Sequence, residues 1–205
     1  MAQCFAVVGG IQKQPKRAPQ SNAFPYIGVS NVQRGRLDVA TLARFELFRG
    51  ELDRLRLEPG DLLVVEGNGS PNEIGRCATW GGEIVDCVHQ NHIIRCRPLV
   101  EGLERFTLVY LNSPPGMATM RKLAVTSAGL YNLSVGKIQR IAIPLPPLAE
   151  QHRIVAKVDE LMAVCDVLES SLASEHTGRG KLLEALLQEA LEDAVLPPSV
   201  GPRPV

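Results

Sequence analysis

Hydrophobic positions between residues 154 and 172 recur at alternating intervals of four and three residues. These positions are Ile154, Val158, Leu161, Cys165, Leu168 and Leu172. The alternation is the a/d spacing of a coiled-coil seam, and it is narrower than the broad apolar stripe of an ordinary surface helix. The pattern therefore predicts a long helix from Ala149 onward that packs along another helix through these six residues, which we call the seam.

A second apolar stripe follows the seam and is wider, as is typical of a helix-bundle face. It comprises Leu182, Leu183, Leu186, Leu187, Ala190 and Leu191. Gly178 and Gly180 interrupt the helical pattern between the two stripes. The sequence leaves open whether 149–195 is one kinked helix or an antiparallel hairpin that turns at 177–180. Residues 196–205 are rich in proline and lack an apolar pattern, so we expect a disordered tail.

The pattern before residue 143 consists of short apolar runs separated by turn residues. It predicts strands at 23–29, 62–65, 83–88, 91–96 and 138–145, and short helices at 103–112 and 117–123. Pro144, Pro146 and Pro147 favour an extended linker over 144–148. The chain is therefore predicted to be α+β, with a mixed domain at 1–143, a linker at 144–148 and a helical region at 149–195.

Composition limits the class of protein. The chain has 205 residues and is 45% hydrophobic, which is enough for one ordinary domain with a core plus an appendage. No apolar run approaches the ~18 residues that a membrane span needs, so we expect no membrane partner. The five cysteines form no CxxC pair, which is typical of a reduced, cytoplasmic protein.

Charge is distributed unevenly, although the formal net charge is +0. Residues 1–37 contain five basic residues and no acidic residue, whereas residues 149–195 contain ten acidic and four basic residues. A basic end suits an anionic partner, and an acidic end suits a different one. Ordinary variation of charge along a chain is the alternative interpretation.

Two blocks of the sequence resemble the DNA-specificity subunits of type I restriction-modification systems. The helical block carries the wording PLPPLAEQHRIV, followed by DELM and CD, within residues 143–172. The front block resembles a target recognition domain in the phrases PYIGVSNVQRGRLD, PGDLLVVEGNGSPNEIGR, CVHQNHIIRCRP and TSAGLYNLSVGKI, which begin at residues 25, 59, 87 and 126. Full-length family members carry two recognition domains and two helical regions. This chain carries one of each, so the resemblance implies a half-size subunit or a fragment of a longer protein.

The resemblance also implies a mechanism. The recognition domain reads a half-site in double-stranded DNA, and the helix sets its distance from a second recognition domain. The helix docks methyltransferase subunits and, through them, the restriction subunit, so neither a catalytic residue nor a cofactor is expected in this chain. A homodimer through the seam would restore two half-sites in inverted orientation.

Reading DNA requires cations for phosphates and forked polar side chains for base edges. The front block supplies both types in its loops. The predicted DNA-binding residues are Lys13, Lys16, Arg17, Asn31, Gln33, Arg34, Arg36, Asn68, Ser70, Asn72, Arg76, His89, Gln90, Asn91, His92 and Tyr131. Solvated surface loops, a structural hairpin at 67–72 and a buried tyrosine are the alternatives.

Two other function classes remain open on the sequence. One is a coiled-coil interaction module that binds no DNA. The other is a metal-dependent enzyme with ligands at Cys87, His89, His92 and Cys96, although this spacing matches no common zinc template and we expect no metal. The sequence shows no nucleotide-binding glycine loop, nuclease pattern or nucleophile elbow, which favours a binding subunit over an enzyme.

Overall fold

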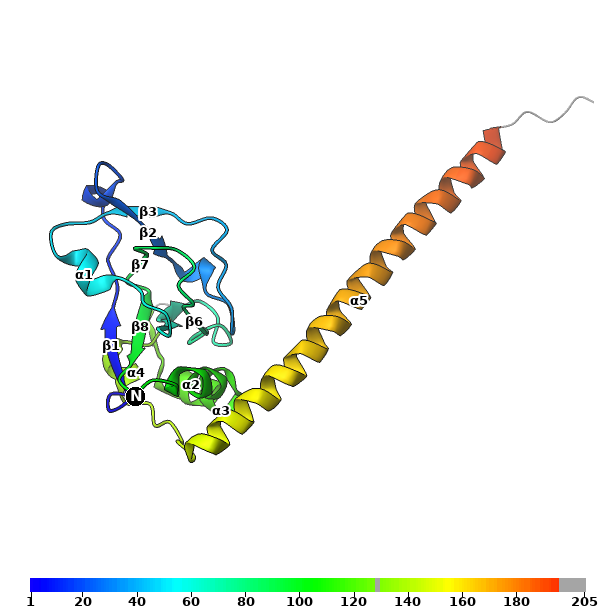
Figure 1. The fold of residues 1–205 in the computed structure, drawn as a ribbon. Helices are drawn as coiled ribbons and strands as arrows, with labels where there is room; N and C mark the ends of the chain where they lie inside the picture. The colour runs from blue at the N-terminus through cyan, green and yellow to red at the C-terminus, as the bar shows by residue number, and fades with distance from the viewer. Residues whose placement is uncertain (128–129, 196–205) are drawn as a thin grey trace, which may run out of the picture. The chain divides into compact units, whose positions relative to one another are not determined.

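The structure, a computed structural model, describes residues 1–127 and 130–195 (Figure 1). The chain divides into two compact units, the first at Met1–Val155 and the second from Ala156 onward. The first unit combines short β-strands with short helices and includes the start of a long helix, which makes up the described part of the second unit. The predicted α+β class is therefore confirmed, and the predicted tail at 196–205 lies outside the described residues.

A four-stranded antiparallel sheet forms the centre of the first unit. Its order is β1 (Phe5–Gly9), β8 (Ile93–Pro98), β4 (Leu62–Val65) and β6 (Cys77–Thr79). All four residues of β4 are buried, because Leu62 and Val64 pack into one core cluster while Leu63 and Val65 pack into another. A continuous apolar run is the expected sequence of a strand with both faces covered.

Two small sheets extend this scaffold. In the first, β2 (Ala23–Ile27) pairs antiparallel with β3 (Arg44–Glu46) and parallel with β7 (Val88–His89). In the second, β10 (Leu130–Asn132) lies between β5 (Gly67–Asn68) and β9 (Val125–Ser127). The parallel pair β2–β7 brings the end of β2 beside the turn that follows β7, which places two distant polar segments next to each other.

Short helices close the first unit. They are η1 (Pro15–Arg17), η2 (Val29–Asn31), α1 (Glu51–Leu55), α2 (Leu103–Asn112), α3 (Pro114–Leu123) and α4 (Val135–Gln139). Leu111 of α2 and Met120 of α3 are fully buried in the same core cluster as β4. Ser113 ends α2 and caps α3, where its hydroxyl accepts a hydrogen bond from the Gly116 amide at 3.4 Å.

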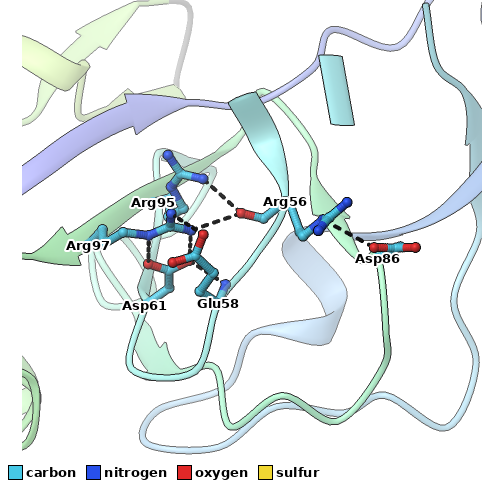
Figure 2. Close-up of polar contacts among 6 residues, drawn as sticks. All are labelled: Arg56, Glu58, Asp61, Asp86, Arg95 and Arg97. Atoms are coloured by element: carbon cyan, nitrogen blue, oxygen red, sulfur yellow. Dashed lines mark hydrogen bonds and ion pairs between the residues drawn. The ribbon is translucent and has the colours of Figure 1, made fainter. Parts of the chain in front are cut away.

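An ion-pair network holds β8 to neighbouring segments of the scaffold (Figure 2). Arg97 donates from Nε and Nη2 to the two carboxylate oxygens of the fully buried Asp61, both at 2.8 Å. Arg95 and Arg97 each donate to the backbone carbonyl of Arg56 at 2.9 Å, and Arg56 pairs with Asp86 at 3.1 Å. The network therefore connects β8 to the chain entering β4 and to the chain entering β7.

Several predicted elements are confirmed and others are wrong. The strand at 62–65 and the helix at 103–112 have the predicted bounds. The strand at 138–145 is wrong, because α4 covers Val135–Gln139 and no strand follows it in the described part of the chain. Ile138 and Ile141 are both buried in one cluster, and their spacing of three is that of a helical turn. The strand at 83–88 is reduced to Val88–His89.

The predicted long helix is α5 (Leu148–Val195), a single continuous helix. Gly178 and Gly180 lie within it, so the hairpin alternative is wrong. In the seam, Ile154 and Val158 are half-buried, whereas Leu161, Leu168 and Leu172 are 52%, 57% and 65% exposed. The leucines of the second stripe are also exposed.

None of the helices within the described ranges combines the length and the apolar character that crossing a membrane requires.

Candidate nucleic-acid interface

Three segments that are distant in sequence line a hollow of about 490 Å³ on the first unit. They are the end of β2 with η2, the loop before β3, and the turn between β7 and β8. The lining residues are Tyr26, Gly28, Val29, Ser30, Asn31, Thr41, Ala43, Gln90 and His92. We call this site the central hollow. It brings together three predicted DNA-binding residues, Asn31, Gln90 and His92.

Asn31 shapes the wall of the central hollow. Its Oδ1 accepts a hydrogen bond from the Gly28 amide at 2.9 Å, and its Nδ2 donates to the Asp38 carbonyl at 2.9 Å. Asparagine bridges of this kind stabilise turns. Both ends of the amide are thus engaged inside the protein, so the geometry supports a structural role for Asn31 more directly than a base contact.

The turn at residues 90–92 is held rigidly by its backbone. The Gln90 amide donates to the Ile27 carbonyl at 2.9 Å, and the Asn91 amide donates to the Ile11 carbonyl at 2.8 Å. A Cβ at Gly10 would lie 2.3 Å from the Gln90 carbonyl oxygen, so only glycine permits this approach. The side chains of this turn are therefore presented from a fixed backbone.

His92 lies beside an acidic group at the edge of the central hollow. Its Nδ1 is 4.0 Å from a carboxylate oxygen of Glu66, and His92 itself is exposed. Partial burial raises the pKa of Glu66, and the attraction of His92 opposes this rise. Tyr131 is half-buried against the first core cluster and pairs by its backbone with Asn68, of which only the backbone is described.

The prediction that His89 contacts DNA is wrong in this structure. His89 belongs to β7, and its side chain is 0% exposed with Nδ1 2.9 Å from the Ile93 carbonyl oxygen. Burial disfavours the charged imidazolium and lowers the pKa of His89 to about 4. The ring is a neutral core group, and the expected turn begins one residue later.

A second group of predicted residues lies on the turn at 33–36 and the loop at 70–76. Arg34 donates to the Asn72 carbonyl, and Gln33 donates to the Ser30 carbonyl at 3.0 Å. The Asn72 amide donates to the Ser70 hydroxyl at 3.3 Å. The Arg34 bond joins the two segments, whereas the other two bonds are local. Arg34 and Gln33 thus use forked groups that were predicted to read bases.

Arg76 and Arg36 lie in this same region, but only the Arg76 side chain has partners within the described part of the protein. Arg76 pairs with Glu73 at 2.7 Å and donates to the Val29 carbonyl at 3.1 Å, so it fastens the 70–76 loop to η2. Arg36 is exposed, and its side chain has no ion pair or hydrogen bond among the described residues. Arg36 is therefore the cation of this group that remains available to a phosphate.

Part of the basic N-terminal segment is also engaged in contacts within the protein. Arg17 makes two 2.8 Å hydrogen bonds to Glu51 and lies over the Phe48 ring at 4.7 Å. The guanidinium lowers the pKa of Glu51 to about 2. Lys13 and Lys16 are exposed and form no ion pair among the described residues, although Lys16 lies 5.7 Å from the Phe48 ring centroid.

A second hollow of about 560 Å³ adjoins this basic segment. Lys13 and Arg17 line it together with Arg44, and it shares Tyr26 and Ala43 with the central hollow. The two hollows are therefore neighbours on one surface. Sequence reasoning missed Arg44, as well as Ser30 and Thr41 in the central hollow, because only tertiary contacts distinguish them from other surface polar residues.

The alternative metal site is not assembled. Cys87 and Cys96 are buried in different core clusters, and His89 is buried while His92 is exposed. Over residues 1–127 and 130–195, no group of three or more histidine, cysteine, aspartate or glutamate side chains is arranged to hold a metal ion.

Comparison with known proteins identifies a family that this sequence matches. Residues 12–175 match the family model described as the type I restriction modification DNA specificity domain. The EcoKI specificity subunit of Escherichia coli K12 is 27% identical over 186 residues, which cover 88% of this chain and 39% of that protein. The StySPI specificity subunit of Salmonella potsdam is 30% identical over 150 residues, which cover 72% of this chain and 32% of that protein.

Solved structures share the fold. A chain from a study of complex assembly and conformational transition of the type I R-M system superposes with a TM-score of 0.68 at 19% identity. The HsdS subunit from Thermoanaerobacter tengcongensis superposes with a TM-score of 0.60 at 21% identity. Each match covers 92% of this chain and 43% of the solved chain, and the chain spans less than half the length of these relatives. The family match extends over most of the sequence, and the chain therefore belongs to the type I restriction modification DNA specificity domain family.

Proposed function

We propose that this chain is a sequence-specific DNA recognition subunit of a type I restriction-modification complex. The family match over residues 12–175 is the observation that carries the proposal. The surface of the first unit supports it, because two neighbouring hollows and the exposed Lys13, Lys16 and Arg36 provide polar and cationic groups for DNA. Within this proposal, residues 1–143 read DNA and residues 144–148 form a linker. Residues 149–195 set the distance between two recognition domains and dock the methyltransferase subunits.

The proposed contacts separate into two classes. Lys13, Lys16 and Arg36 are proposed to neutralise phosphates, since each is exposed and carries no ion pair in the described chain. The turn at 90–92 is proposed to face the bases, because its backbone is fixed and its side chains line or border the central hollow. Arg17, Arg34 and Arg76 are proposed to support the loops, since each is held by internal partners.

The proposed role of α5 is to pair with a second helical region. Leucines 161, 168 and 172 of the seam are more than half exposed, and contiguous exposed apolar side chains on a helix mark an interaction face. We propose a homodimer through this seam, which would present two recognition domains to the two halves of one DNA site. Methyltransferase subunits would dock on the assembled helices and carry the chemistry, so the chain itself is proposed to be non-catalytic.

Salt-dependent binding tests the DNA-reading part of the proposal. The full chain is combined with its methyltransferase subunits, and duplex affinity is measured over a range of salt concentrations. Each neutralised phosphate contributes a slope of about −0.9 to log K against log salt, so three cations per chain predict roughly −2.7 per chain. Replacing Lys13 and Lys16 with alanine should make the slope shallower by about 1.8 per chain.

The matched control is Lys157→Ala on α5. Lys157 is a surface cation that already pairs with Glu160 at 2.8 Å, so its removal should leave the slope unchanged. Mapping of methylated sites in the same preparation tests sequence specificity. Binding without salt dependence, together with methylation at random sites, would exclude the proposed function.

A further inference from the structure

The side chain of Gln90 lines the central hollow and lies against Gly28. Its amide oxygen lies only 3.2 Å from where a Cβ would stand on Gly28, so the side chain lies directly against that glycine. Its backbone amide donates to Ile27, and its carbonyl accepts from the Ile93 amide, both at 2.9 Å. Gln90 is therefore fixed through its backbone and positioned through its side chain.

The carboxamide of Gln90 nevertheless has no hydrogen-bond partner within the part of the chain that the structure describes. Asn31 and Gln33 already use their side-chain amides, because Asn31 bonds to Gly28 and Asp38 while Gln33 bonds to Ser30. A half-buried amide that is carried on a hydrogen-bonded backbone, and whose donor and acceptor are both free, is prepared for an external partner.

We propose that Gln90 reads an adenine in the major groove of the target DNA. This inference rests on the proposed function and assigns one base contact within it. A glutamine carboxamide forms two hydrogen bonds to adenine, because its oxygen accepts from the N6 amino group and its nitrogen donates to N7. No other base offers that pair of groups on its major-groove edge.

The surroundings favour a base contact over a phosphate contact. Among the described residues that line the central hollow, His92 is the only ionisable side chain apart from the Tyr26 phenol, and it lies beside the carboxylate of Glu66. Phosphate binding favours cations, and the exposed lysines 13 and 16 lie on the neighbouring basic segment instead. The central hollow thus supplies a neutral, directional group rather than positive charge.

Gly28 acts as a positioning residue for Gln90. Its φ of −107° and ψ of 179° are open to any residue, so alanine introduces no backbone strain there. The added methyl would lie 3.2 Å from the Gln90 amide oxygen and 3.5 Å from Asn31 Oδ1, which would displace the glutamine by a few tenths of an ångström. Recognition should therefore depend on Gly28 even though glycine has no side chain to contact DNA.

The experiment compares consensus sequences. The full chain with its methyltransferase subunits is offered randomised duplexes, and the preferred site is determined for the wild type and for Gln90→Ala. One adenine position of the wild-type consensus should become degenerate in the variant, and affinity for the wild-type site should fall about 5- to 150-fold. Preferences at the other positions and the salt slope should not change, because no phosphate contact is removed.

Gly28→Ala should weaken the preference at that same position, by a smaller factor than Gln90→Ala. Gly136→Ala is the matched control, because an added Cβ there would meet nothing within 4 Å. Urea unfolding of each variant reports whether the first unit remains folded. An effect of Gly28→Ala at the shared position, with unchanged unfolding, would separate positioning from a loss of structure.

Three outcomes would overturn the inference. Gln90→Ala could retain the complete wild-type consensus, it could lose a position that is not adenine, or it could lose affinity equally for all sequences with a shallower salt slope. Each would overturn the adenine contact and leave the proposed function standing. A wild-type protein without any sequence preference would overturn the proposed function and this inference together.

Discussion

The core leucines of the first unit and the leucines of α5 lie in opposite environments. In the first unit, Leu55, Leu62, Leu63 and Leu111 are 0% exposed. In α5, the leucines from Leu161 to Leu191 are 52% to 67% exposed. Burial of apolar area drives both folding and association. The core leucines of the first unit are buried within that unit, whereas the leucines of α5 require a second surface to become buried. The same residue type therefore serves stability in one region and association in the other.

The strongest test of this comparison is to introduce charged side chains into the seam. Leu161→Asp combined with Leu168→Asp should abolish self-association, since each buried leucine contributes about 1.5–3 kcal/mol and appears twice in a dimer. Sedimentation measures the change in mass. Unfolding of the first unit should be unaffected, because these leucines lie in the second unit.

Val167→Asp is the matched control for the charged seam. Val167 is 69% exposed and lies off the seam, so this substitution should leave association unchanged. A wild-type chain that stays monomeric, alone and with methyltransferase subunits, would contradict the prediction.

The second test addresses the interior of the first unit. Asp61→Asn removes the buried charge that Arg97 contacts through two hydrogen bonds, and it should lower the free energy of unfolding by about 3 kcal/mol (Figure 2). Urea denaturation measures this loss. The control is Glu58→Gln, because Glu58 also pairs with Arg97 but its side chain is 56% exposed. A pair so exposed contributes less than about 1 kcal/mol, and equal losses in the two variants would contradict the comparison.

The third test uses pH. The pKa of His89 falls from its ordinary value of 6.5 to about 4 in the folded protein, so the unfolded chain binds more protons between these values. Stability should therefore decrease as pH falls through this window, by about 2 kcal/mol between about pH 7 and about pH 5. His89→Gln should remove that component of the slope. Identical pH profiles for the two proteins would show that His89 is not the group responsible.

The smallest expected effect concerns the glycines of α5. An added Cβ at Gly178 or Gly180 would meet nothing within 4 Å, so alanine there should stabilise the helix by about 1 kcal/mol at each site. Circular dichroism should record higher helicity and a higher melting temperature. A loss of helicity would indicate that these glycines form a turn, as in the hairpin considered from the sequence.

Elements determined by local pattern could be predicted from the sequence. The bounds of β4 and α2 follow from short apolar runs between clear turn residues, and α5 follows from its seam. By contrast, β1 pairs with β8 across almost ninety residues, and β3 has only three residues, so local patterns identified neither. The apolar run at 138–145 also suggested a strand, where α4 and the spacing of Ile138 and Ile141 give a helical turn.

The sequence could predict which residue types the candidate site contains, but it could not predict which of these side chains bind partners within the protein. The basic and amide residues were identified, but Arg17 is bound to Glu51 and Arg76 is bound to Val29, 34 and 47 positions away. Such partners come together only through the fold. The sequence therefore could not show which cations remain free, nor that His89 points into the core while Gln90 faces outward.

The backbone bonds of Gln90 have a consequence for how such a protein can evolve. Its amide and carbonyl are held by Ile27 and Ile93, and neither bond depends on the identity of the side chain. Mutations at codon 90 can therefore be sampled with little penalty to folding, whereas mutations at Gly10 cannot, because any side chain there would collide with the adjacent carbonyls. Under our proposal, selection can retune the target of this protein one residue at a time, within a scaffold that stays the same.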